Sequence, residues 1–547
     1  MHYLIALFLV LLSLFSWQFT KDQILESPSV IVHVGDELIV SDKNGSEFNL
    51  SREEHNNSSL LLPAFPQAQG GGAGSRGGRG GLVYCVTNLN DRGEGSLRYG
   101  LEKLSGARTI VFRVGGYIHL SYPIVVENDG FITIAGQSAS GDGITLTTVQ
   151  SKEPVLIFRN AHDIILRYIR IRKGGMLAQG QHGSGLVISR GGHDIIVDHC
   201  SVSWAGDDNI NIWANKEGRG GLYNITIQNS ISSEGLNYGH PATGLIAGGS
   251  ANVNSMKNFS IHHNLFAHNK NRNPLLKVAS GEIINNLIYD WSWWATGIGG
   301  GIEVDIIANR YKVGKSTRHK GRGEIVYKAY DPHAKNPNAT GILGEPSIYF
   351  EQNIGLHNRD STQDGWDKMI EAVNPHWGYP LINGKPRKQG LSQSYRRYVR
   401  RFSHFPVEVT PVEALESNLL GFGGVGASQR LNERGEWVFN RDLVDKRVIQ
   451  SYYEGEGGLI YNVDDAGGWS IYQDGAYRYV LEAEFVQHLD KYQLNMGVPY
   501  RDSDRDGMPD VWEQKYHLDP HNNRDATMDR DGDGYENLEE FLNGTQP

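Results

Sequence analysis

Two acidic segments near the C-terminus hold the residues whose types and spacing point most directly to chemistry. They are DSDRDGMPDVWE and DRDGDGYENLEE, and each has oxygen-bearing side chains at positions 1, 3, 5, 9 and 12 and glycine at position 6. Calcium takes six to eight oxygen ligands, and this spacing wraps them around the ion while the glycine permits the turn. The segments therefore predict two calcium loops with the ligands Asp502, Asp504, Asp506, Asp510, Glu513, Asp529, Asp531, Asp533, Asn537 and Glu540.

The charge distribution agrees with a cation site in this tail. Residues 502–547 hold thirteen Asp and Glu but only four Lys and Arg, so nearly all of the net charge of −10 lies there. Local acidity of this kind indicates a binding site rather than a property of the whole protein. The paired loops resemble dockerin-like and thrombospondin-type calcium modules, which act as stabilisers or as docking elements for a partner. The sequence leaves both roles open.

Upstream of the tail, the chain repeats short runs rich in β-branched residues. The runs are FITIAG, DIILRYIRIR, DIIVDHCSVSW, NITIQNSI, NFSIHHNLF, GEIINNLIYDW and DIIANRY. A polar residue recurs once in successive runs, at His199, Asn229, Asn264, Asn286 and Asn309, with intervals of 30, 35, 22 and 23 residues. Intervals near 22 with occasional longer insertions are typical of a solenoid whose coils stack strands and admit loops at one face.

These repeats predict an all-β parallel β-helix in which stacked Asn side chains bond from coil to coil. A β-sandwich spaces its strands more closely and has no register-keeping Asn, so it fits less well. The 67 glycines and 26 tyrosines also favour a turn-rich β protein. SIYFEQN, with Asn353, is a candidate for one further coil.

The N-terminal segment suggests export. The apolar run from Leu4 to Phe15 is followed by polar residues and predicts a signal peptide over residues 1–20, with an uncleaved N-terminal anchor as the alternative.

The remaining boundaries expected are an extension over 21–62, the β-helix over 63–355, an extension packed on it over 356–500, and calcium loops over 501–547. Cys85 and Cys200 allow one disulfide or two free thiols.

Between Phe65 and Tyr311 the sequence resembles the bacterial pectate lyase family. The resemblance rests on GGRGGLVYCVTNLNDRGEGSLRYGLE, RTIVFRVGGYIHL, ITIAGQSASGDGITL, HDIIVDHCSVSWAGDD, SISSEGLN and FSIHHNLFAHNKNRNPLLK. It implies a secreted, monomeric enzyme on a right-handed parallel β-helix that cleaves 1,4-linked galacturonan by calcium-assisted β-elimination. No nucleic-acid partner is expected, because an RGG-type reading of GGGAGSRGGRGG does not suit an exported chain.

The resemblance also implies roles for individual residues. Arg272 matches the catalytic base, and Lys277 stands where family members usually have a second arginine that grips the substrate. Lys270 is a neighbouring cation, and His240 lies in the loop where some members bind substrate through a lysine. Lysine cannot form the two-pronged contact that arginine makes with a carboxylate, so we expect the substrate contacts to differ here.

For the calcium ion of the active site, the resemblance points to Asp207, Asp208 and Asn211. A further family acid, about fourteen residues before the DH pair, is replaced here by Ser184 and Gly185. We expect this departure to weaken calcium binding. The DH pair itself, Asp198 and His199, is expected to brace the turn that carries the ligands.

Two other functions remain open. GDDNINI is superficially similar to the paired-Asp motif of polygalacturonases, which hydrolyse the same polymer on a β-helix with clustered carboxylates. A non-catalytic pectin-binding protein with a decayed metal site would also account for the missing acid. Trp291, Trp293 and Trp294 could stack on sugar rings or pack between coil and loop.

Overall fold

The chain is described by a computed structural model that divides into two compact units, residues 1–61 and 62–547. In the first unit the structure describes three strands, β1 (Val30–Val34), β2 (Glu37–Ser41) and β3 (Glu47–Leu50), which form an antiparallel sheet in the order β1-β2-β3. In the second unit it describes residues 62–547 except 149–151, 175–182, 219, 238–242, 318–322, 374–380, 383–384, 387–388, 402–403 and 490. The predicted signal peptide lies outside the described residues.

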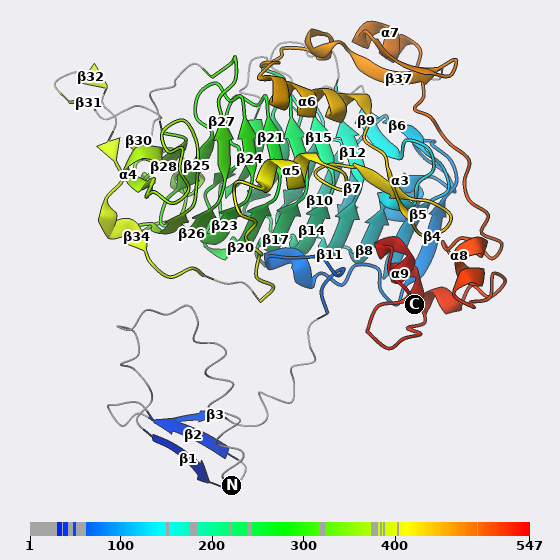
Figure 1. The fold of residues 1–547 in the computed structure, drawn as a ribbon, viewed down its shortest axis with the longest axis horizontal. Coiled ribbons are helices and arrows are strands. Elements are labelled where there is room, and N and C mark those ends of the chain that lie inside the picture. Colours follow the sequence, from blue (N-terminus) through cyan, green and yellow to red (C-terminus); the bar gives the residue numbers. More distant parts are fainter. Residues whose placement is uncertain are drawn as a thin grey trace. The chain divides into compact units, whose positions relative to one another are not determined.

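The second unit is the parallel β-helix that the repeats predict, made of three long sheets. Sheet 1 has eleven strands: β4 (Leu82–Val86), β5 (Arg108–Phe112), β8 (Gly130–Ala135), β11 (His162–Arg167), β14 (His193–Asp198), β17 (Tyr223–Gln228), β20 (Lys257–His262), β23 (Ser280–Ile284), β26 (Glu303–Ile307), β29 (Ser347–Glu351) and β34 (Arg396–Arg397). Figure 1 shows these strands stacked coil upon coil.

The other two sheets complete each coil. Sheet 2 has eight strands: β6 (Gly116–Leu120), β9 (Ile144–Thr148), β12 (Ile169–Arg172), β15 (Ser201–Ser203), β18 (Ile231–Ser233), β21 (Leu265–Ala267), β24 (Leu287–Tyr289) and β27 (Arg310–Lys312). Sheet 3 has ten: β7 (Ile124–Glu127), β10 (Leu156–Arg159), β13 (Leu186–Ser189), β16 (Asp208–Ala214), β19 (Thr243–Gly249), β22 (Leu275–Leu276), β25 (Thr296–Gly299), β28 (Ile325–Lys328), β30 (Ile370–Val373) and β33 (Gln389–Gly390). Parallel pairing continues past residue 355, because β30 pairs with β28 and β34 with β29.

Shorter elements complete the unit. The remaining strands are β31 (Leu381–Ile382), β32 (Lys385–Pro386), β35 (Gln429–Leu431), β36 (Trp437–Phe439), β37 (Trp469–Gln473) and β38 (Ala476–Val480). The α-helices are α3 (Leu97–Glu102), α4 (Trp366–Met369), α5 (Leu415–Leu420), α6 (Leu443–Glu454), α7 (Glu482–Gln487), α8 (Asp510–Lys515) and α9 (Asn537–Asn543). The 3-10 helices are η2 (Gly71–Gly74), η3 (Gly136–Ser138), η4 (Val253–Ser255), η5 (Pro337–Thr340), η6 (Gln393–Tyr395), η7 (Val463–Ala466) and η8 (Asp525–Thr527). None of the helices among the described residues is long and apolar enough to cross a membrane.

In-register pairing stacks equivalent side chains inside the solenoid. Ile164, Ile195, Ile225 and Phe259 occupy matching positions on four successive coils, and each is fully buried. Burying an aliphatic side chain of this size stabilises the fold by about 1.5–3 kcal/mol. The apolar core therefore runs along the axis of the β-helix.

An asparagine ladder follows the corner between sheets 1 and 2. The side chains of Asn264, Asn286, Asn309 and Asn353 stack, each Nδ2 donating to the Oδ1 of the next at 3.0, 2.9 and 2.9 Å. All four are almost fully buried. Asn353 thus belongs to a further coil, as SIYFEQN suggested.

The first two members predicted for this ladder were wrong by one position. Gln228 pairs with His262, so Asn229 lies beside His263, and His199 precedes Asn229 in the same row. The ladder position itself is taken by Ser230, whose N–H donates to Asn264 Oδ1 at 2.9 Å. Residue intervals alone do not reveal which residues pair between neighbouring coils. A loop insertion changes the interval by any number of residues but leaves the strand pattern on either side unchanged.

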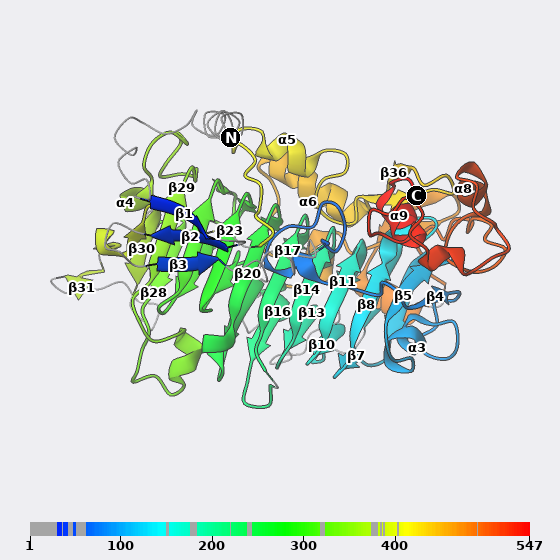
Figure 2. The ribbon, with the colours of Figure 1, turned by 90° about the horizontal axis from the view of Figure 1, so that it is seen from below.

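The segment after the last coil returns along the outside of the solenoid. Leu415 and Leu419 of α5 and Val448 and Tyr452 of α6 pack against residues of sheet 2, among them Leu287. Figures 1 and 2 both show α5 and α6 alongside the stacked strands.

Cys85 and Cys200 are both free thiols, so the disulfide interpretation does not hold.

Candidate functional site

A row of cations crosses the outer face of sheet 3. Lys277 follows β22 and Lys328 ends β28, and between them lies Gly299 of β25, which pairs with Lys328. A Cβ at Gly299 would lie 3.2 Å from Lys277 Cγ, so the glycine leaves room for the lysine stem. Gly248 of β19 lies on the other side of Lys277, and beyond it comes Trp213 of β16. This face of sheet 3 therefore carries two lysines and the ring of Trp213, with a glycine between each successive pair.

Burial and mutual repulsion change the charge state of these lysines. Only 8% of Lys277 and 4% of Lys328 is exposed. Burial, with the charge of Arg272, lowers the pKa of Lys277 to about 8. Burial, Lys277 and Arg272 together lower the pKa of Lys328 to about 6, so its amine is neutral at pH 7. Lys277 Nζ also donates to the carbonyl of Ala339 at 2.6 Å.

Arg272, the expected base, lies at the same edge of the sheet and is paired with Asp208. Its Nη1 donates to both carboxylate oxygens of Asp208, at 2.9 and 3.2 Å. Asp208 begins β16 and is 2% exposed. Its carboxylate also accepts from the hydroxyl of Thr243 and, at 3.2 Å, from Nδ2 of Asn211. The structure thus brings Arg272, Asp208 and Asn211 together.

The position of the missing acid adjoins this group. The backbone N–H of Asp207 donates to the carbonyl of Gly183, and that of Gly185 donates to the carbonyl of Asp208. Ser184, between those two glycines, is buried. The neighbouring coil therefore presents a hydroxyl-bearing residue where the family resemblance leads one to expect a carboxylate.

The other predicted residues have varied positions. The backbone carbonyl of Lys270 accepts from the amides of Ser292 and Trp293 at 3.1 Å, and its side chain is partly exposed. His240 lies outside the described residues. Asp198 is fully buried and bonded to Arg167, Gln228 and His199, the arrangement of a structural brace.

The three tryptophans divide between two clusters. Trp291 packs in the main core against Tyr311, with ring centroids 6.3 Å apart, so it does not face a substrate. Trp294 is buried in a separate cluster with Ile246, and Trp293 and Trp213 are partly buried against it. Of the aromatic rings in this cluster, those of Trp213 and Trp293 are the ones partly open to solvent. Sequence reasoning missed Trp213 and Lys328, although each occupies a strand position.

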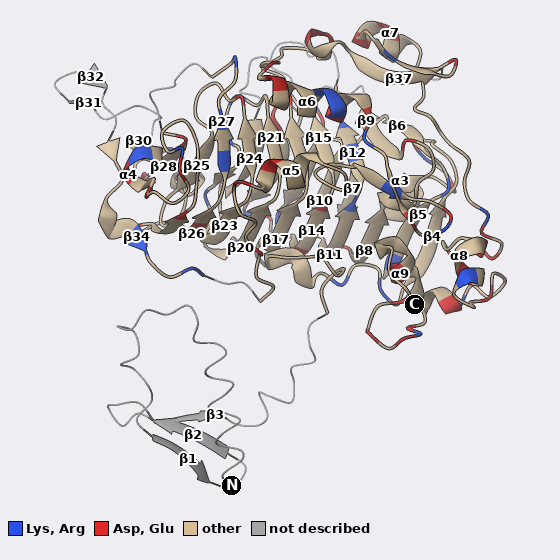
Figure 3. Ribbon diagram, in the orientation of Figure 1, with Lys and Arg blue, Asp and Glu red and all other residues tan. Residues whose placement is uncertain are grey.

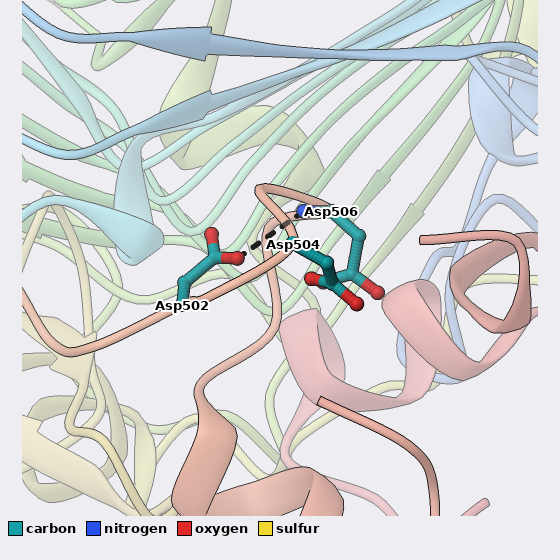
Figure 4. Close-up of side chains that lie close together, drawn as sticks. All are labelled: Asp502, Asp504 and Asp506. Carbon is teal, nitrogen blue, oxygen red and sulfur yellow. Dashed lines mark hydrogen bonds between the residues drawn. The ribbon is translucent and has the colours of Figure 1, made fainter. Parts of the chain in front are cut away.

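The first acidic loop gathers the carboxylates that its spacing predicts, with one exchange. Figure 4 shows Asp502, Asp504 and Asp506 converging, with Asp502 accepting from the amide of Asp506 at 3.2 Å. Asp506 also groups with Glu513 and Asp525, and Asp525 comes from the segment between the two loops. Gly507 has φ of 95°, the left-handed turn that position 6 requires.

Asp510, a predicted ligand, makes contacts within the loop. Its oxygens accept from the amide and hydroxyl of Ser503 at 2.7 and 2.8 Å, and it pairs with Arg501 at 3.0 Å. Asp525 occupies the ligand group in its place. Spacing could not predict this, because Asp525 lies beyond the end of the twelve-residue motif.

Several buried oxygens of this loop lack hydrogen-bond donors among the described residues. They are both oxygens of Asp504, both of Glu513, and one each of Asp506 and Asp525. Glu513 is fully buried and Asp506 is 2% exposed. Burial, together with the neighbouring carboxylates, raises the pKa of Glu513 to about 9, and burial likewise raises the pKa of Asp506 to about 8. A bound cation would remove both the desolvation cost and the repulsion.

The second loop is more open but has the same pattern. Asp529, Asp531 and Asp533 lie within ligand distance of one another and are exposed. Buried oxygens of Asn537 and Glu540 accept no hydrogen bond among the described residues. Burial and the three aspartates raise the pKa of Glu540 to about 7. Figure 3 shows acidic residues along the loop that joins α8 and α9.

No family model matches the chain. It is 31% identical over 492 residues to a probable pectate lyase C of Aspergillus oryzae, covering 89% of this chain and 94% of the relative. It is 32% identical to a probable pectate lyase C of Aspergillus terreus, covering 90% and 96%.

Similar solved structures are more distant. The major allergen of cedar pollen has a TM-score of 0.41 and 19% identity, covering 64% of this chain and 90% of its own. A pectate lyase of Bacillus sp. N165 in complex with trigalacturonate has a TM-score of 0.39 and 15% identity, covering 66% and 99%.

Proposed function

The chain belongs to the pectate lyase family, and on that premise we propose that it cleaves 1,4-linked galacturonan by β-elimination. The products are unsaturated oligogalacturonides. The observation that carries the proposal is the cluster of basic groups on sheet 3, where Arg272, Lys277 and Lys328 lie close enough to lower one another's pKa. Basic groups gathered in this way suit a polymer that carries a carboxylate on each sugar.

The reaction requires removal of the proton on C5 and departure of the oxygen on C4. The C5–H electrons form the C4=C5 double bond, the C4–O bond breaks, and the leaving sugar oxygen takes a proton. Negative charge spreads onto the uronate carboxylate during deprotonation, and the positive charge of Lys277 stabilises it there. We assign the base to Arg272. A guanidinium has no acceptor, so Arg272 has to leave its pair with Asp208 and give up one proton to solvent before it accepts the proton from C5. Lys328 is the adjacent group that is already neutral at pH 7.

The contacts of Asp208 and Asn211 do not favour a calcium ion between these two residues. Asp208 already accepts from Arg272, Thr243 and Asn211, and Asn211 turns its amide nitrogen toward Asp208. The adjoining coil contributes Ser184 instead of an acid. The positive charge for the reaction therefore comes from the basic side chains, and the paired-Asp hydrolase is disfavoured because Asp208 is committed to an ion pair.

Calcium suits the tail instead. Asp506 joins two overlapping groups of carboxylates, one with Asp502 and Asp504 and one with Glu513 and Asp525, and oxygen ligands of this kind are those that calcium prefers. Asp529, Asp531, Asp533, Asn537 and Glu540 form the second set. Bound calcium would neutralise these carboxylates and order the tail.

Packing favours the stabilising role of the tail over the docking role. Met508, Trp512 and Phe541 pack against Val111 and Ala135 of the β-helix. Polar contacts reinforce this interface: Arg113 pairs with Asp502 at 2.6 Å and Arg79 with Glu539 at 2.7 Å. The apolar face that a docking partner would need is thus covered by the β-helix itself.

We further propose that the protein is secreted. The proposed calcium loops and the polymeric substrate are both consistent with an extracellular site of action.

The test is the ultraviolet absorbance of unsaturated uronide released from polygalacturonate. We expect the wild-type protein to generate it and Arg272→Ala to lose it. Arg359→Ala, which removes an exposed arginine, is the matched control and should retain activity. Reducing ends without absorbance would establish a hydrolase, and polymer binding without either signal would establish a binding protein.

A further inference from the structure

A cavity of about 610 Å³ lies between α6, the loop that follows it and the outer edge of sheet 2. Its lining includes Ser451, His268, Gly457 and Gly458. None of these residues belongs to the basic cluster of Arg272, Lys277 and Lys328. We propose that Ser451, His268 and Asp290 form a second catalytic site, a hydrolytic triad that acts on a small neutral ester.

The three side chains are in hydrogen-bond sequence. Ser451 Oγ lies 2.7 Å from His268 Nε2, and His268 Nδ1 lies 2.8 Å from Asp290 Oδ2. His268 is 1% exposed, Asp290 is fully buried, and 8% of Ser451 is exposed. This is the order of nucleophile, base and orienting carboxylate that activates a hydroxyl for acyl transfer.

The solenoid positions two of the three groups. Ala267 of β21 pairs with Tyr289 of β24, so the residues that follow them, His268 and Asp290, stack on successive coils. The second oxygen of Asp290 accepts from the amide of Ser316 at 2.6 Å, which holds the carboxylate in place. A helix from a distant part of the chain, α6, then presents Ser451 to the imidazole.

The carboxylate determines which imidazole nitrogen carries the proton. Ionised Asp290 only accepts, so His268 Nδ1 donates to it and Nε2 offers its lone pair to Ser451. The hydroxyl proton of Ser451 has a second acceptor, the carbonyl of Val448 at 2.7 Å. Rotation of the hydroxyl from Val448 to His268 therefore prepares the nucleophile without moving the helix.

The loop after α6 supplies donors for a developing oxyanion. Among the described residues, the amides of Gly457 and Gly458 have no hydrogen-bond acceptor, and both glycines line the cavity. Gly457 has φ of 83°, and a Cβ there would lie 2.5 Å from His268 Cε1 and 3.3 Å from Ser451 Cβ. Only glycine lets the backbone come this close to the pair. Two such amides can stabilise a tetrahedral intermediate.

The charges around the cavity select the substrate class. Glu234, Glu454, Glu456 and Asp465 line it, and Arg447 is paired with Glu234. A free carboxylate would be repelled, whereas a neutral acyl or alkyl ester would not. Such esters also mask uronate carboxylates, so a chain that binds polyuronate could remove them. The triad does not rest on the proposed lyase activity, because the two sites share no residue.

The reaction balances without any co-reactant except water. Ser451 Oγ attacks the ester carbonyl while its proton passes to His268 Nε2, and the alcohol leaves with that proton. Water then attacks the acyl-serine, again giving a proton to His268, which returns it to Ser451 Oγ as the acid departs. Asp290 stabilises the transient imidazolium in both steps.

The experiment uses the full chain with p-nitrophenyl acetate as substrate and a fluorophosphonate probe as label. We expect release of p-nitrophenol to fall at least about 100-fold in Ser451→Ala, since removing a triad nucleophile abolishes its acyl transfer. We also expect the label to be found on the peptide that contains Ser451. Ser417→Ala is the matched control, because Ser417 also lies on a helix and donates to the carbonyl three residues earlier.

Two results would overturn the proposal: ester hydrolysis in the wild type no faster than in Ser451→Ala, or labelling that spares Ser451. The labelling uses wild-type protein, so it decides the matter even where the variant folds poorly. Lyase activity measured in the same samples shows whether the site around Arg272 is intact, so a loss of esterase activity can be told from a loss of lyase activity.

Discussion

Removing calcium should loosen the tail and the end of the β-helix that it covers. Glu513 is fully buried, and among the described residues both its carboxylate oxygens, both of Asp504 and one each of Asp506 and Asp525 accept no hydrogen bond. A site with a dissociation constant of about 10 µM, in 1 mM calcium, stabilises the bound form by about 2.7 kcal/mol. That free energy corresponds to about 100-fold slower exchange of the amides that the tail protects.

The assay is hydrogen–deuterium exchange of the full chain in calcium and in chelator. Slowing is expected in α8, α9 and β5, because Trp512 and Phe541 pack on Val111. In Glu513→Gln, which keeps the side-chain size but removes one ligand charge, the calcium effect should shrink about tenfold or more. Glu433→Gln, at an exposed glutamate, is the matched control. Equal exchange with and without calcium, or an unchanged effect in Glu513→Gln, would refute the reasoning.

Three further predictions concern the ladder and the lysine row. Asn286→Ala removes two ladder bonds and leaves buried polar groups unpaired, so urea unfolding should show a loss of about 2–4 kcal/mol, against little change in exposed Asn338→Ala. Lys328→Met should stabilise the protein at pH 7, because the native amine is neutral there but the amine of the unfolded chain is charged. The increase in unfolding temperature over the wild type should fade toward pH ~10. An increase that is constant with pH would contradict the assignment. Lys277→Met should raise KM for polygalacturonate by about 10–100-fold, the value of one charged hydrogen bond, while exposed Lys335→Met leaves it unchanged.

Local patterns in the sequence determined the repeat architecture and the grouping of carboxylates in the acidic tail. A coil of the solenoid is about 22 residues long, and its strands are β-branched runs, so the periodicity is visible without any contact information. A calcium loop takes its ligands from twelve consecutive residues, which is why the spacing predicted the grouping of Asp502, Asp504 and Asp506. The family resemblance likewise rested on contiguous motifs.

The tertiary structure decided what depends on register and on long-range packing. Ser230, and not Asn229, begins the ladder because strand pairing sets the register. Asp525 joins the first loop because the tail folds back on itself. Lys328 comes near Lys277 only because the three coils that carry β22, β25 and β28 stack in register.

The hydrolytic triad illustrates the same limit most clearly. His268 and Asp290 are 22 residues apart, but Ser451 is 183 residues beyond His268. No spacing rule links them, since α6 returns over the outside of the solenoid and is positioned by apolar packing of Val448 and Tyr452 on sheet 2. Residue types and local spacing thus determined the fold and its repeating elements. Only the packed structure decided which distant side chains meet, because that choice is made by burial of surfaces and not by sequence distance.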